Sequence, residues 1–167
     1  MTTRSENTVT INAPVEKVHA ALTNADYWAH NVANLSTEPG QVHSFEGDAS
    51  GAVATLFEVL PIDLLPAAVQ AMISQSLKVK RVVNIGPLSD GTAYIEYTAD
   101  VKGTPVDFKG SITLTGDDAS STLNYENQIT VAIPMMGAAI EPKVADALGE
   151  LFQNEANLCA EWISNNL

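Results

Sequence analysis

The chain has 167 residues, of which 46% are hydrophobic, so it is long enough and apolar enough to bury the core of one domain. Its 20 acidic and 8 basic residues give a net charge of -12, which argues against nucleic acid and anionic membranes as partners, because both require basic patches. The single cysteine, Cys159, excludes an intramolecular disulfide and a thiolate metal cage.

No apolar run approaches the roughly 20 residues that cross a bilayer, so no stable membrane insertion is expected. Residues 1–7 are polar and do not resemble a signal peptide. These features together predict a cytoplasmic protein that consists of a single domain over residues 1–167.

The first structural signal is a strand that is followed at once by a helix. Residues 8–12 alternate between polar and apolar side chains, which predicts a half-buried strand. Pro14 suits the first position of a helix, where its missing N–H costs nothing, and residues 15–22 carry the apolar stripe of a short helix. Asn24 can cap a second short helix, on which Trp28 would pack against a sheet.

The middle of the chain is rich in strand signals that are separated by glycine, proline and aspartate. Short connections join the last four of these strands and no helix lies between them. They therefore predict an antiparallel meander and not a parallel sheet. The expected strands cover residues 41–46, 52–59, 77–85, 92–102, 106–115 and 122–131.

Two helical patterns complete the chain. In the apolar insertion over residues 60–75, Pro66 can start a helix that would close the open end of the sheet or extend the core. Residues 143–165 repeat with a helical period and would form a helix about 35 Å long. Pro142 either starts this helix or kinks one that begins near Met135.

Residues 11–28 read INAPVEKVHAALTNADYW. They are similar to the opening apolar-x-Ala-Pro-x-x-x-Val-x-x-x-Leu-x-(Asn/Asp)-x-x-x-Trp of bacterial members of the START-like (SRPBCC, Bet v 1-type) superfamily. The order of the expected elements over the whole chain fits the same superfamily. Residues 60–75 and 134–137 look like an uncharacterised bacterial branch of it.

The resemblance implies an α+β helix-grip fold. In this fold a curved antiparallel sheet of about seven strands wraps around a long C-terminal helix, here with two short N-terminal helices and a short helical insertion. It also implies a deep apolar cavity between sheet and helix, in which members bind lipids, sterols, polyketides or plant hormones. Some members are cyclases or hydroxylase components. The superfamily has no universal set of catalytic residues, so none is carried over to this chain.

Alternation along the strands assigns one face of each strand to the cavity, and a ligand site needs a few polar groups on that apolar surface. The expected ligand-binding residues are Phe57, Arg81, Ile95, Tyr97, Phe108, Ile112, Tyr125, Asn127, Met136, Phe152 and Glu155. An isolated buried charge is costly, so Arg81 should find a carboxylate, for which Glu155 is the candidate. Alternatively, Arg81 extends to the mouth of the cavity and Glu155 lies at the edge of the helix's apolar stripe.

Motifs for catalysis, metal binding or phosphate binding are not found. His19, His30 and His43 are scattered and lack metal-ligand spacing, and no Gly-x-Ser-x-Gly or glycine-rich phosphate loop occurs. Cys159 lies on the apolar stripe of the terminal helix, where a thiol usually fills the core. We therefore expect no metal, no cofactor and no catalytic set.

Three functions remain open. The preferred one is a soluble binding protein for a small hydrophobic molecule that is lipid-, sterol- or polyketide-like, acting as a monomer or homodimer. The second is a cyclase- or aromatase-type enzyme, and the third is a protein-interaction domain with a collapsed cavity. The residues that would orient a substrate or move protons in the enzyme are Arg81, Tyr97, Tyr125, Asn127 and Glu155.

Overall fold

The computed structural model describes residues 2–35, 39–60, 67–70, 77–102, 105–133, 135 and 137–167. In this part of the chain, one seven-stranded antiparallel sheet has the strand order β1-β7-β6-β5-β4-β3-β2. The elements in chain order are β1 (Thr2–Ile11), α1 (Val15–Leu22), α2 (Ala25–Asn34), β2 (Gln41–Asp48), β3 (Gly51–Leu60), α3 (Ala67–Gln70), β4 (Leu77–Ile85), β5 (Thr92–Val101), β6 (Val106–Gly116), β7 (Ser121–Val131) and α4 (Gly137–Asn166).

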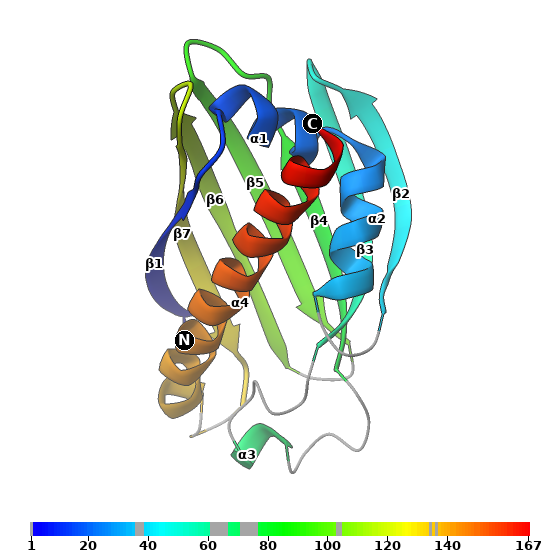
Figure 1. The fold of residues 1–167 in the computed structure, drawn as a ribbon. Helices are drawn as coiled ribbons and strands as arrows, with labels where there is room; N and C mark the ends of the chain where they lie inside the picture. Colours follow the sequence, from blue (N-terminus) through cyan, green and yellow to red (C-terminus); the bar gives the residue numbers. More distant parts are fainter. Residues whose placement is uncertain are drawn as a thin grey trace.

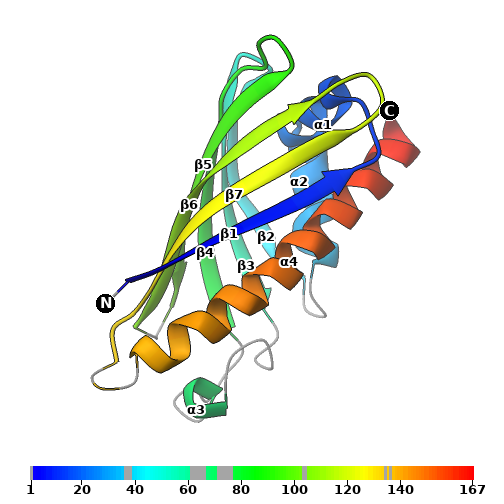
Figure 2. The ribbon, with the colours of Figure 1, turned by 90° about the vertical axis from the view of Figure 1, so that its left-hand side faces the viewer.

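The sheet is curved and α4 crosses its concave side, with α1 and α2 beside the C-terminal half of α4 (Figure 1). In the view turned by 90°, α4 lies along the strands as a second layer (Figure 2). The helix packs mainly against β1 and β7. This arrangement confirms the predicted α+β helix-grip fold, in which the apolar face of the sheet and the apolar stripe of the helix cover each other.

β1 begins at Thr2, although alternation of apolar residues predicts a strand only over residues 8–12. It pairs with β7 along its whole length, from Thr2 opposite Thr130 to Ile11 opposite Ser121. The inward positions near its start are polar, so hydrophobicity does not reveal this part of the strand. Its pairing with β7 uses backbone N–H and C=O groups, which polar residues carry as well as apolar ones.

The predicted N-terminal helices are confirmed, and their starts follow from local chemistry. Pro14 directly precedes α1, and Asn24 caps α2 by accepting a hydrogen bond from the Asp26 amide at 2.8 Å. At the junction of the two helices the Trp28 indole N–H donates to Leu22 O at 2.8 Å. This bond fixes the orientation of a buried tryptophan against the sheet.

Of the two alternatives for Pro142, the structure has the one in which the helix begins earlier, at Gly137, with Pro142 inside it. The start of α4 is anchored by Glu141, which is fully buried. Its carboxylate accepts hydrogen bonds from Thr3 Oγ1 at 2.7 Å and from the Val131 amide at 3.0 Å. β1 and β7 are thereby bound to the first turns of the helix.

The prediction that Phe57 on β3 faces the cavity is wrong. Directly opposed residues of an antiparallel pair share a face, and β3 pairs Leu56 with the buried Arg81 and Phe57 with the exposed Lys80. Phe57 therefore lies on the outer face, where its ring contacts that of His43 at a centroid distance of 5.0 Å. Alternation did not distinguish the two faces of β3, because both carry apolar residues. Several of the larger apolar side chains lie on the outer face.

The expected helix of the insertion is represented by α3, at the end of the molecule opposite α1 (Figures 1 and 2). The rest of the proposed covering segment, residues 61–66 and 71–76, lies outside the described residues, as does Met136. Among the helices that the structure describes, none combines the length and the hydropathy of a transmembrane span.

Candidate functional site

A cavity of about 30 Å³ lies between the sheet and α4, and residues of α1 and α2 also line it. This volume has room for only one or two water molecules. The cavity is lined by Ile11, Leu22, Tyr27, Trp28, Arg81, Val83, Ile85, Ile95, Tyr97, Ile112, Leu123, Tyr125, Phe152, Glu155, Ala156 and Cys159. The deep cavity that the resemblance implies is therefore nearly closed in this structure.

Aromatic rings account for the small volume. The rings of Tyr125 and Phe152 stack with a centroid distance of 4.1 Å and an interplanar angle of 13°, which joins β7 to α4. Tyr97 meets the same Phe152 ring edge-on at 6.0 Å. Because these rings lie between the sheet and α4, side chains fill most of the space there.

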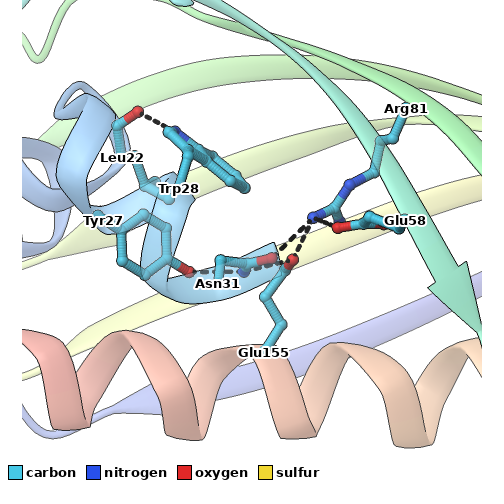
Figure 3. A network of polar contacts seen from close by, with 7 residues as sticks. All are labelled: Leu22, Tyr27, Trp28, Asn31, Glu58, Arg81 and Glu155. Carbon is cyan, nitrogen blue, oxygen red and sulfur yellow. Dashed lines mark hydrogen bonds and ion pairs between the residues drawn. The ribbon is translucent and has the colours of Figure 1, made fainter. Parts of the chain in front are cut away.

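Two of the lining residues, Arg81 and Glu155, form a buried ion pair (Figure 3). Arg81 Nη2 on β4 donates to Glu155 Oε2 on α4 at 2.5 Å and to Glu58 Oε1 on β3 at 2.9 Å. The side chains of Arg81 and Glu155 are only 7% and 12% exposed. The predicted pairing of Arg81 with Glu155 is thus confirmed, and the alternative of an arginine at the cavity mouth is wrong.

Asn31 brings α2 into the same network. Its Nδ2 donates to Glu155 Oε2 at 3.0 Å and to the Tyr27 hydroxyl at 3.2 Å, and the side chain is fully buried. Trp28 covers the guanidinium, with Arg81 Cζ 5.5 Å from the ring centroid, an arrangement that favours a cation. Four elements, α2, β3, β4 and α4, therefore meet at the side chain of Arg81.

The charges in this network perturb one another. Burial lowers the pKa of Arg81, but Glu155 and Glu58 raise it by more, so the guanidinium stays protonated with a pKa above its ordinary value. Burial raises the pKa of Glu58, against the opposing effect of Arg81. The result is a buried cluster in which two carboxyl groups share one cation.

A second polar network lies further along the sheet. The Tyr97 hydroxyl donates to Asn127 Oδ1 at 2.5 Å, and Asn127 Nδ2 donates to Ser5 Oγ at 3.2 Å and to Asn7 Oδ1 at 2.8 Å. Burial raises the pKa of Tyr97 above its ordinary value, so the hydroxyl stays protonated. Four of the five polar residues named for an enzyme therefore fall into two hydrogen-bond networks, with Arg81 and Glu155 in one and Tyr97 and Asn127 in the other.

The structure brings together seven of the eleven predicted ligand-binding residues. Those that line the cavity are Arg81, Ile95, Tyr97, Ile112, Tyr125, Phe152 and Glu155. Phe108 is buried but is not part of the lining, and Asn127 belongs to the second network. Phe57 is on the other face of the sheet, and Met136 is outside the described residues.

The prediction missed the contribution of α2 and of Glu58. Tyr27 and Asn31 lie one turn apart on α2, Trp28 follows Tyr27, and all three are buried. Glu58 is buried because it pairs with Arg81, whereas a carboxylate in a strand ordinarily indicates the face exposed to solvent, so nothing in the sequence pattern identified it. Within the described residues, including this site, no three His, Cys, Asp or Glu side chains gather closely enough to hold a metal ion.

Sequence comparison identifies a family. Residues 6–163 match the family described as "Protein of unknown function (DUF2505)". The chain is 28% identical over 161 residues to uncharacterized protein Rv0481c of Mycobacterium tuberculosis, and the match covers 92% of each chain.

Solved structures share the fold at low sequence identity. The Zhui aromatase/cyclase of Streptomyces sp. R1128 is 13% identical, with a TM-score of 0.57 over 99% of this chain and 93% of that one. A START superfamily protein of Mycobacterium smegmatis is 15% identical, with a TM-score of 0.56 over 98% and 99% of the two chains. The chain therefore belongs to the DUF2505 family and has the helix-grip fold of the START-like superfamily.

Proposed function

We propose that the chain is a binding protein, and that one domain over its 167 residues holds a small hydrophobic molecule between the sheet and α4. The observation that carries this proposal is the composition of the cavity wall. The wall is mainly aliphatic and aromatic, and its charged side chains are the paired Arg81 and Glu155. An apolar pocket with few polar groups is the usual form of a site for an apolar ligand.

A ligand larger than a water molecule has to open the cavity, whose volume is about 30 Å³. Tyr125 and Phe152 would separate, or α4 would move away from the sheet, because these rings fill the space between the two. Burying about 300 Å² of apolar ligand surface provides about 7 kcal/mol before ordering costs are subtracted. This free energy is enough to offset the separation of one stacked aromatic pair, which contributes about 0.5–1.5 kcal/mol beyond its area.

The names of two structural neighbours support a site for organic molecules within this fold. One neighbour is an aromatase/cyclase, and another is a norcoclaurine synthase in complex with a transition-state analogue. Binding is favoured over catalysis in this chain because Arg81, Glu155, Tyr97 and Asn127 are divided between two separate hydrogen-bond networks. As part of the proposal, the protein acts in the cytoplasm as a monomer or homodimer, states that light scattering distinguishes.

Native mass spectrometry of the freshly purified protein tests the proposal, together with titration of an apolar fluorescent dye. Ala156 lines the cavity from α4, so Ala156→Phe should fill it and abolish both the co-purified mass and the dye binding. Ala139 is exposed on the same helix, and Ala139→Phe is the matched control that should change neither. Equal binding by both variants, or no binding by the unmodified protein, contradicts the proposal.

A further inference from the structure

The hydrogen bonds of Arg81 leave one of its donors unused. Those between Arg81 and described side chains all use Nη2, which contacts Glu155, Glu58 and Asn31. Its Nε is buried and has no hydrogen-bond partner within the described part of the chain. A buried donor without a partner loses its hydration and gains nothing in return, so it is a site where a missing acceptor is expected.

The same side chain lines the cavity, and two of the surrounding polar groups donate their hydrogen bonds elsewhere. The Trp28 indole N–H donates to Leu22 O, and the Tyr97 hydroxyl donates to Asn127. Neighbouring positions of the lining, such as Val83 and Ile95, are aliphatic. A ligand would therefore meet few available donors within a largely apolar surface, namely the Arg81 Nε–H and the hydroxyl of Tyr125.

Charge limits what that ligand can be. The guanidinium already faces the carboxyl groups of Glu155 and Glu58, so a ligand carboxylate would add an anion to a cation that is already neutralised. Like charges repel strongly in a buried site. An ammonium group fits no better, because it has only donors to offer and cannot accept a hydrogen bond from the Arg81 Nε–H.

We propose, on the basis of the binding role above, that the ligand is an electrically neutral, largely apolar molecule with an uncharged oxygen that accepts a hydrogen bond from Arg81. Ketones, aldehydes and esters have this chemistry, and carboxylic acids and amines at neutral pH do not. Arg81 then selects its ligand as a donor in a neutralised cluster and not as a free positive charge.

Four probes with a common phenyl group test this proposal in NMR titrations of the unmodified protein at pH 7.5. They are acetophenone with a neutral acceptor, ethylbenzene with none, benzoate as the anion and benzylamine as the cation. Hydrogen bonds to charged groups are the stronger class, so acetophenone should bind about tenfold more tightly than each of the other three.

Each outcome decides a separate point. Equal binding of acetophenone and ethylbenzene overturns the inference and leaves the binding role intact, as does tighter binding of benzoate or benzylamine. If none of the four binds, the binding role fails as well.

A variant assigns the selectivity to the guanidinium. Arg81→Lys keeps the positive charge and removes the Nε–H, so the preference for acetophenone over ethylbenzene should fall from about tenfold towards onefold. Lys80→Met changes the exposed neighbour on the same strand and should keep the preference. If Arg81→Lys retains the full preference, Arg81 is not the donor. If it fails to fold by circular dichroism, the four-probe comparison still decides the proposal.

Discussion

Arg81 Nη2 and Glu155 Oε2 lie 2.5 Å apart, although the two residues are 74 positions apart in the sequence. This contact joins β4 to α4 beside the cavity, and Glu58 on β3 contributes a second carboxylate to the same nitrogen. The position of α4 over this part of the sheet therefore depends on a charged contact as well as on apolar packing. The contact also makes the energetics of the site accessible to experiment.

A double-mutant cycle of Arg81→Met and Glu155→Gln should reveal coupling between the two residues. Arg81→Met alone leaves two buried carboxyl groups without their cation and should cost about 3–5 kcal/mol of unfolding free energy. The coupling energy in urea unfolding should be about 1–3 kcal/mol, as for residues in one hydrogen-bond network. Glu161→Gln, on an exposed part of α4, is the matched control. A coupling energy near zero would mean that the pair contributes nothing to stability.

Glu58 should make the protein less stable as the pH rises. Burial has the largest effect and raises the pKa of Glu58 above its ordinary value of 4.5. Between the pKa of the unfolded state and that of the folded state, the folded state therefore binds more protons. Stability from this group is complete below pH 4.5 and is lost as the pH rises through the pKa of the folded state. Urea unfolding from pH 4.5 upward should show Glu58→Gln gaining stability relative to the unmodified protein, whereas the exposed Glu126→Gln should not. A constant difference across that range contradicts the assignment.

Cys159 should be unreactive in the folded protein. The residue is 2% exposed, and burial raises the pKa of its thiol to about 12, so little thiolate exists at pH 8. A disulfide reagent should label the thiol only after urea unfolds the protein, and Cys159→Ala should remove all labelling. Because Cys159 lines the cavity, rapid labelling under native conditions would instead mean that the cavity opens to solvent.

Phe152→Ala should lower the stability of the protein and enlarge the cavity. The ring is 2% exposed and stacks on Tyr125, so its removal should cost about 3–5 kcal/mol of unfolding free energy. The enlarged cavity should bind toluene more tightly than the unmodified protein does, as followed by NMR. Leu167→Ala, at an exposed position, should change neither quantity. An unchanged affinity for toluene would indicate that the surrounding residues collapse into the space.

The elements of the fold were predictable because their signals are local. Alternation located the strands, Pro14 and Asn24 marked the starts of the first two helices, and the period of the C-terminal segment gave α4. These signals depend on the spacing of neighbouring residues and not on contacts with distant parts of the chain. They failed at the start of β1, where the inward residues are polar and the strand depends on pairing with β7.

The candidate site was predictable only in part. Arg81 and Glu155 stood out as polar residues within apolar patterns, and their pairing followed from the cost of an isolated buried charge. Glu58 was missed because the apolar residues on both faces of β3 allowed the wrong face to be chosen. Asn31 was missed because an asparagine on a short helix has no pattern that distinguishes a buried network from an exposed surface.

The sequence by itself determined which segments become strands and helices, because side-chain spacing governs how each segment can bury its apolar side. The helix-grip architecture was implied by the resemblance of residues 11–28 to the START-like superfamily. Only the tertiary structure decided the register of β3 against β4, the meeting of four elements at Arg81 and the closure of the cavity to about 30 Å³. Those properties depend on distances and volumes between residues far apart in the chain, and the packing of the whole molecule sets them.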